Sequence, residues 1–247
     1  MRTGLLTLLV LLAAPTAGAE SFCTRTDFEG VPYTVCEAGA DRHDIRLWLV
    51  DEAGAVIGGF PQLQARLAAR GERLAFAMNG GMYHPDRRPV GLHVEDGREI
   101  APLVRRARGG NFGLLPNGVF CVLEGRAAVI ETEAFAAAPP ACRHATQSGP
   151  MLVIGGMLHP RFLPDSISLN IRNGVGVAAD GRRVVFAISD APVSFHGFAR
   201  FFRDHLGLPD ALYLDGSVSR LWAPELGRSD IGLPLGPLVG VALPAGG

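Results

Sequence analysis

The sequence predicts an α+β fold with mixed, largely antiparallel β-sheets that are built from hairpins, with a few packing helices. Two observations lead to this prediction. Short runs of alternating apolar and polar residues are separated by turn-forming pairs that commonly join antiparallel strands, and the few helical segments do not alternate regularly with the strands. The turn-forming pairs are Asp96-Gly97, Asn117-Gly118, Glu124-Gly125, Gly155-Gly156 and Asp180-Gly181.

Two segments have the spacing of amphipathic helices. Residues 60–71 place leucines on one face and end at Gly71, in the position where glycine favours the turn after a helix. Residues 194–207 place phenylalanines three and four positions apart, and Ser194 is positioned to cap the first turn. We expect both apolar faces to pack in the core and neither to bind a cofactor.

The first 19 of the 247 residues have the pattern of a secretory signal peptide. One arginine precedes an apolar run over residues 5–14, and an Ala-Gly-Ala cleavage site ends at Ala19. The apolar run is shorter than the roughly 20 residues that span a membrane, so we expect no stable membrane span after cleavage. The sequence therefore predicts a periplasmic or secreted protein in which residues 20–247, without any linker, form a single domain.

The cysteines are even in number and all lie in the exported part, which indicates disulfides. They are Cys23, Cys36, Cys121 and Cys142. Their spacing favours a bridge between the first two and another between the last two, although four cysteines allow three pairings. No C-x-x-C motif is present, so we interpret the cysteines as structural.

Charge and motifs exclude several classes of function. The 23 basic residues nearly balance the 24 acidic ones, so no basic surface for nucleic acid is predicted. The H-E-x-x-H, EF-hand and P-loop motifs are absent, as is the G-x-S-x-G elbow of α/β-hydrolases. We therefore predict no cofactor and no metal site, and leave a divalent metal ion open.

Three turn-like stretches do not fit the hairpin pattern, because each ends an apolar run or starts a buried one without a clear returning strand. They are Asn79-Gly80-Gly81, Gln147-Ser148-Gly149 and Asp215-Gly216. Arg172 lies just before another glycine-containing turn. A guanidinium in such a place suits a phosphate or carboxylate, and a surface ion pair is the alternative. Asp190 ends a further apolar run and is either a second site carboxylate or a loop cap.

Five segments in order resemble the successive motifs of the phosphodiester glycosidase family, and the match is closest to its bacterial exported branch. They are NGGMY, GNFGLLPNGVF, ATQSGPML, IRNGVGV and ALYLDGSVSRLW, between Asn79 and Trp222. The resemblance implies a small-molecule or glycan substrate whose sugar C1–O–phosphate link is hydrolysed. One position departs from the pattern, because Val218 stands where many relatives have glycine.

The resemblance also suggests roles for individual residues. We expect Asp215 to be the nucleophile or general base, Arg172 to neutralise the phosphate, and Asn79 to orient sugar hydroxyls. Because a phosphomonoester, with a second pKa of about 6, is a good leaving group, the second carboxylic acid of ordinary glycosidases matters less. The residues expected to bind the substrate are Gly80, Gly81, Tyr83, Gln147, Ser148, Gly149, Asp190, Gly216 and Ser217.

Two other classes of function remain as alternatives. One is a non-catalytic envelope or polysaccharide-binding module that uses the same cleft. The other is a hydrolase of a different ester or amide, with Ser148 as the nucleophile. Loss of turnover in Asp215→Asn would separate an enzyme from a binding module, and full activity of Ser148→Ala would remove the serine hydrolase.

Overall fold

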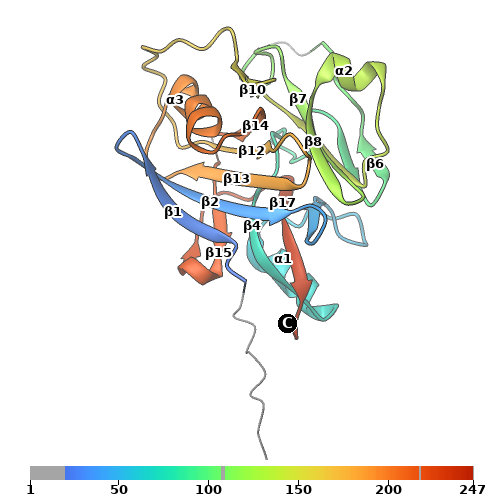
Figure 1. Ribbon diagram of the computed structural model, residues 1–247. Coiled ribbons are helices and arrows are strands. Elements are labelled where there is room, and N and C mark those ends of the chain that lie inside the picture. Colours follow the sequence, from blue (N-terminus) through green and yellow to red (C-terminus); the bar gives the residue numbers. More distant parts are fainter. Residues whose placement is uncertain (1–19, 107–108, 217, 247) are drawn as a thin grey trace, which may run out of the picture.

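The computed structural model describes residues 20–106, 109–216 and 218–246, and these form three β-sheets with helices packed on their outer faces (Figure 1). The predicted signal peptide, residues 1–19, lies outside the described residues. Every strand pair within the described part of the chain is antiparallel. The α+β class with largely antiparallel sheets is therefore confirmed.

The seven-stranded sheet forms the middle of the molecule (Figure 1). Its strand order is β1 (Cys23–Phe28), β2 (Val31–Gly39), β13 (Arg183–Ser189), β12 (Asn173–Val177), β14 (Asp210–Asp215), β10 (Met151–Ile154) and β11 (Met157–Leu158). Both faces are buried. In β13, for example, Phe186 and Ile188 pack into the central core, while Val185 and Ala187 pack under a helix on the other face.

That helix is α3 (Phe195–Arg200), which continues as a π-helical turn over Phe201–His205. The Ser194 hydroxyl accepts a hydrogen bond from the Gly197 amide, so the predicted cap is confirmed. Phe198 and Phe202 are fully buried against the seven-stranded sheet. The phenylalanine stripe is therefore core, as the sequence predicts.

The second sheet packs on the opposite face of the seven-stranded sheet and encloses the central core. Its order is β16 (Arg228–Ser229), β15 (Leu221–Ala223), β4 (Glu72–Asn79), β17 (Leu238–Pro244) and β3 (Asp44–Trp48). Helix α1 (Phe60–Ala69) covers its outer face and buries Leu63 and Leu67 there. The 3-10 turn η2 (Pro224–Leu226) connects β15 to β16.

The third sheet stands to one side and carries helix α2 (Thr132–Ala137) (Figure 1). Its order is β6 (Arg98–Ala101), β5 (His93–Glu95), β9 (His144–Ser148), β7 (Gly118–Leu123) and β8 (Arg126–Glu131). One disulfide, Cys121–Cys142, lies here, and the other, Cys23–Cys36, joins β1 to β2. The pairing favoured by the spacing is confirmed.

Four of the five predicted hairpin turns are confirmed: they join β5 to β6, β7 to β8, β10 to β11 and β12 to β13. The fifth is wrong, because no strand precedes Asn117-Gly118. The Asn117 side chain is buried, donates to the Phe112 carbonyl and accepts from the Thr132 hydroxyl. It therefore anchors a loop instead of turning a hairpin. No helix in the described residues is long and apolar enough to cross a membrane.

Candidate active site

Asp215 is the last residue of the central strand β14 and lines a cleft of about 680 Å³. Its side chain is 8% exposed. Its carboxylate accepts a hydrogen bond from the Gly216 amide at 2.6 Å, and its own amide donates to Asn173 Oδ1 at 3.1 Å. The other residues that line the cleft are Met82, Tyr83, Pro85, Arg87, Val90, Gly109, Gly110, Asn111, Phe112, Val218, Leu233 and Pro234.

Two buried asparagines hold the strand ends around Asp215. The Asn79 amide group donates to Asn173 Oδ1 at 3.2 Å, and the Asn173 amide group donates to the Asn79 carbonyl at 2.9 Å. The Arg220 amide donates to Asn79 Oδ1 at 2.9 Å. Asn79 is fully buried and does not line the cleft. The structure therefore brings Asn79 close to Asp215, as part of its support.

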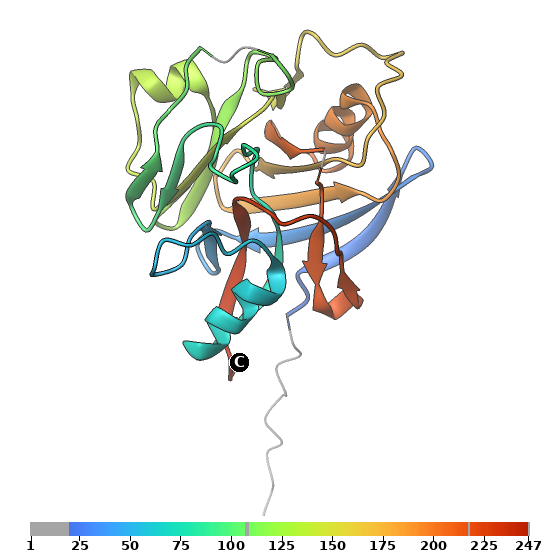
Figure 2. The same cartoon turned by 180° about the vertical axis from the view of Figure 1, so that it is seen from behind.

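Arg172 lies directly before β12 and is 1% exposed. Its Nε donates to the Val193 carbonyl at 2.9 Å and its Nη2 to the Ser168 carbonyl at 3.0 Å, in the loop that runs beside α3 (Figures 1 and 2). The guanidinium stacks on the Phe195 ring at 3.7 Å. In the described part of the chain no carboxylate pairs with it, and the Tyr213 side chain lies nearby, with its ring centroid 5.5 Å from Arg172 Cζ.

The cost of this burial is visible in the acid–base properties of Arg172. Desolvation lowers the pKa of its guanidinium below the usual range. A buried charge without a counter-charge costs several kcal/mol, and such groups are commonly paired with an anion. Arg172 is therefore a cation without a charged partner among the described side chains.

Tyr213 connects Arg172 to Asp215. Its fully buried hydroxyl lies beside Gly216, where a methyl group on the glycine would overlap it, and the Arg172 and Asn111 side chains lie near enough to affect its pKa. Burial raises the pKa of the Tyr213 phenol, the Arg172 charge opposes the rise, and the Asp215 carboxylate adds to it. Tyr213 therefore stays protonated, and its pKa depends on the charges of both Arg172 and Asp215.

Gln147 and Ser148 face the protein interior. The Gln147 amide oxygen accepts from the Leu92 and Val104 amides, and its Nε2 donates to the Val104 carbonyl at 2.8 Å. The Ser148 hydroxyl is fully buried and donates to the Leu214 carbonyl at 2.9 Å. Neither residue lines the cleft.

The candidate glycines approach other parts of the protein. A methyl group at Gly80 would meet the Leu238 backbone at 2.9 Å, and one at Gly149 would meet Asn117 Cβ at 2.4 Å. One at Gly81 would meet the Thr146 hydroxyl at 2.6 Å. These close contacts explain why glycine is required at the three positions. Ser217, which was also expected in the site, lies outside the described residues.

Tyr83 lines the cleft as expected, on a segment whose conformation the sequence did not indicate. β4 runs on without a hairpin at Asn79, as expected, because its partners are β15 and β17. The chain then folds back in one short antiparallel bridge between Tyr83 and Pro89, despite its prolines. Burial raises the pKa of the Tyr83 phenol, and the nearby Asp215 carboxylate raises it further.

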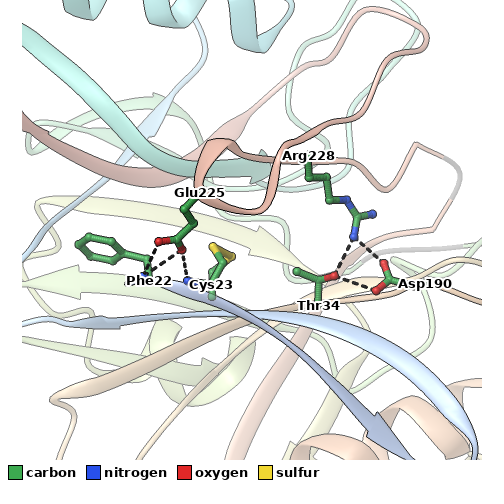
Figure 3. The surroundings of a disulfide bond; sticks show 7 residues. Phe22, Cys23, Thr34, Asp190, Glu225 and Arg228 are labelled. Atoms are coloured by element: carbon green, nitrogen blue, oxygen red, sulfur yellow. Dashed lines mark hydrogen bonds and ion pairs between the residues drawn. A yellow bond between two sulfur atoms is a disulfide. The ribbon is translucent and has the colours of Figure 1, made fainter. Parts of the chain in front are cut away.

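Asp190 lies at the same end of the seven-stranded sheet as Asp215 but two strands away. Its carboxylate accepts from the Thr34 hydroxyl at 2.7 Å and pairs with Arg228 (Figure 3). Close by, Glu225 accepts hydrogen bonds from backbone amides next to the Cys23–Cys36 bridge (Figure 3). Asp190 does not line the cleft, so the structure does not bring it together with Asp215.

Some cleft residues were not anticipated from the sequence. Arg87, which is half-buried at the cleft, has a φ of 67°, a left-handed conformation that is uncommon for a residue other than glycine. The position of Arg87 between Pro85 and Pro89 is the sequence feature that could have indicated this unusual conformation. Asn111 and Phe112 come from an irregular loop, and the motif GNFGLLPNGVF that contains them was the available signal. Within the described residues, no group of three or more His, Cys, Asp and Glu side chains is arranged to hold a metal ion.

The fold and the cleft together define an α+β protein with a carboxylate at the end of a central strand and a buried arginine behind it. A family model described as phosphodiester glycosidase matches residues 72–230, which is more than half of the chain. The chain therefore belongs to the phosphodiester glycosidase family. The resemblance seen in its motifs is confirmed.

Individual relatives agree with this assignment. The uncharacterized protein YigE of Escherichia coli is 33% identical over 178 residues, which cover 72% of this chain and 69% of YigE. The catalytic domain of zebrafish N-acetylglucosamine-1-phosphodiester α-N-acetylglucosaminidase, auto-inhibited by its pro-peptide, superposes with a TM-score of 0.55 at 14% identity, covering 93% of this chain and 86% of that one. A protein of Burkholderia pseudomallei, described as a putative exported protein, gives a TM-score of 0.56 at 13% identity, over 85% and 74% of the two chains. At such identities the structural matches show a shared fold.

Proposed function

We propose that this protein is an exported hydrolase that cleaves the bond between C1 of a sugar and the oxygen of a phosphodiester. Water supplies a hydroxyl group to C1 and a proton to the phosphate oxygen, so the products are the free sugar and a phosphomonoester. Family membership supports the reaction class. The zebrafish enzyme with the same fold is named for N-acetylglucosamine 1-phosphodiesters, so this sugar is the first choice for assays.

The buried charge of Arg172 is the observation that carries the proposal. It lies behind the turn at Asp215-Gly216, with the Tyr213 hydroxyl between them. In this water-poor environment its field reaches the cleft with little screening. Arg87 adds a second guanidinium from the cleft side. A phosphate bound over Gly216 would therefore lie between two positive charges.

The presence of a single carboxylate in the described cleft lining also fits a phosphate leaving group. Among the described residues that line it, Asp215 is the only acid. Ordinary glycosidases need a second carboxylic acid to protonate the leaving oxygen, whereas a phosphomonoester leaves readily because its second pKa is about 6. One carboxylate that acts as nucleophile or base is sufficient for this reaction.

The surrounding residues then have distinct tasks in the proposal. Tyr213, which stays protonated, is a hydrogen-bond donor beneath the phosphate. Asn79 and Asn173 fix the Asp215 backbone, so they act on the reaction by holding the carboxylate in place. Gln147 fixes the loop around Val104.

Export is part of the same proposal. Two disulfides are typical of proteins that fold outside the cytoplasm, and the first 19 residues resemble a signal peptide. We expect the mature protein to begin at Glu20 and to be periplasmic or secreted. Mass spectrometry of the N-terminal peptide from the exported protein tests this expectation.

The decisive experiment measures hydrolysis of N-acetylglucosamine 1-(methyl phosphate) by the purified mature protein, as release of free sugar and of methyl phosphate. Asp215→Asn is expected to lower kcat by about 10²–10⁴-fold. Asp210→Asn is the matched control, because Asp210 begins the same strand, at the end opposite to Asp215, and its carboxylate accepts a hydrogen bond from the Gly155 amide.

Two results would contradict the proposal. Equal losses of activity in Asp215→Asn and Asp210→Asn would show that the carboxylate at the cleft has no special role. Binding of sugar phosphodiesters without any turnover, over both anomers and a panel of sugars, would instead identify a non-catalytic binding module.

A further inference from the structure

One part of the cleft lining is apolar, while Asp215, Tyr83, Arg87 and Asn111 line other parts of it. Met82, Val90, Leu233 and Pro234 all contribute side chains to the lining. None of these side chains donates or accepts a hydrogen bond. A sugar hydroxyl group that is held against this apolar part of the lining would find no hydrogen-bond partner there, at a cost of about 1–3 kcal/mol. A hydrocarbon would instead gain from the burial.

Val218 extends the apolar surface to the reacting group. It is three positions after Asp215, is half-buried, and packs against the apolar cluster of Trp48 and Leu235 while still lining the cleft. This apolar cluster therefore fixes the Val218 side chain at the edge of the cleft. The cleft thus has a fixed hydrocarbon surface next to the carboxylate.

Leu233 is an exposed apolar residue on an anchored loop. Its side chain is 72% exposed, and its neighbour Ile231 is 93% exposed. The loop is held because the Leu233 carbonyl accepts from Arg220 Nη2 and the Pro234 carbonyl accepts from the Tyr83 hydroxyl. Leu233 therefore continues the apolar part of the cleft lining out to the solvent, next to Pro234.

We infer that the phosphate of the natural substrate carries a hydrocarbon chain, so that the substrate class is a sugar 1-phosphodiester of a long-chain alcohol. This inference rests on the proposed function and names its leaving group. Water adds across the C1–O bond, the hydroxyl group stays on the sugar, and the proton goes to the phosphate oxygen. The second product is an alkyl phosphate whose chain lies along Val218 and Leu233.

The test compares two substrates that differ only in chain length, the methyl and octyl phosphodiesters of N-acetylglucosamine, both at concentrations where they are monomeric. Each methylene group that is buried in the cleft contributes about fourfold to kcat/KM. Burial of three methylene groups therefore predicts a preference of about 60-fold for the octyl diester.

Two serine substitutions test where the hydrocarbon chain of the substrate binds. Leu233→Ser is expected to lower the octyl-to-methyl ratio of kcat/KM by about 15-fold, because it removes apolar contact equivalent to roughly two methylene groups. Met157→Ser is the matched control, since Met157 is 71% exposed, like Leu233 at 72%, but lies at the β10–β11 hairpin outside the cleft. This control should leave the ratio unchanged.

The possible failures are distinguishable. If both diesters are hydrolysed at equal kcat/KM, or if both serine variants change the ratio alike, the hydrocarbon inference is overturned and the proposed reaction stands. If neither diester is hydrolysed, the proposed function fails. Calorimetric binding of octyl phosphate and methyl phosphate then decides the inference separately, because the octyl compound must bind at least tenfold more tightly and lose that advantage in Leu233→Ser.

Discussion

Replacement of Arg172 by methionine separates what this side chain does for the fold from what it does for the site. The substitution removes two hydrogen bonds to carbonyl groups and the stacking on Phe195. These are worth about 1 kcal/mol per hydrogen bond and about 1–2 kcal/mol for the stacked cation. It also removes the desolvation penalty of a buried charge, which is several kcal/mol. Methionine is flexible enough to fill the space.

The two contributions nearly cancel, so the free energy of unfolding of Arg172→Met should stay within about 1–2 kcal/mol of the wild type and could exceed it. Hydrolysis should fall by about 10²–10³-fold, which is typical of removing one charge-stabilising group. Urea unfolding followed by circular dichroism gives the first quantity, and release of methyl phosphate gives the second. Native stability combined with lost activity identifies a residue retained for function.

The reasoning fails if the variant is destabilised by more than about 3 kcal/mol while the folded fraction keeps wild-type kcat, because Arg172 would then be a structural residue. Arg228→Met is a useful comparison. That arginine is paired with Asp190 and Asp230. Its removal leaves both carboxylates without this ion pair, so it should destabilise the protein without the same loss of kcat.

Three further outcomes follow from individual contacts. Burial lowers the pKa of His144 from 6.5 to about 4, so the unfolded chain takes up the proton first, and the free energy of unfolding should fall by up to about 1.4 kcal/mol per pH unit from pH 6.5 to 4. Urea unfolding should show a weaker dependence in His144→Gln. Ser148→Ala should lose about 1 kcal/mol of stability with its bond to Leu214 and keep kcat, whereas lost turnover would favour a serine nucleophile. Gly216→Ala should reduce kcat, since its methyl group overlaps the Tyr213 hydroxyl, and unchanged kinetics would remove Tyr213 from the site.

The hairpins were predictable because their signals are local. A glycine-containing turn between two alternating runs sets both strands and their register within about a dozen residues, as for β7 and β8. Asn117-Gly118 shows the limit of this rule. The same dipeptide serves as a buried anchor when groups outside the turn itself, here the Phe112 carbonyl and the Thr132 hydroxyl, satisfy the Asn117 side chain.

The arrangement of the sheets was not predictable from such signals. β4 lies between β15 and β17, more than 100 residues further along the chain. This pairing is set by burial of the apolar residues of β4 on both faces, which no short window of sequence reveals. The sequence therefore predicted the class of fold and most of its hairpins, and left the order of the strands open.

The candidate site was predictable only in part for a related reason. The motifs located the strand ends, and Asp215 and Tyr83 do line the cleft. A motif does not tell whether a polar side chain faces the substrate or the interior, and Gln147 and Ser148 face the interior. Leu233 comes from a loop without any pattern, so its place in the cleft depends on the tertiary structure.

The buried polar network explains why the motif residues cluster although so few of them reach the cleft. Three strand ends from two sheets meet at Asn79, Asn173 and Asp215, and neutral amide groups satisfy the backbone there. The neutral amide groups of Asn79 and Asn173 fix the strand end that carries Asp215. In the proposed function, the charge of Arg172 acts on the phosphate in the cleft. A charged side chain at position 79 would bury a further charge among these strand ends. An apolar side chain there would remove the hydrogen bonds to Asn173 and to the Arg220 amide.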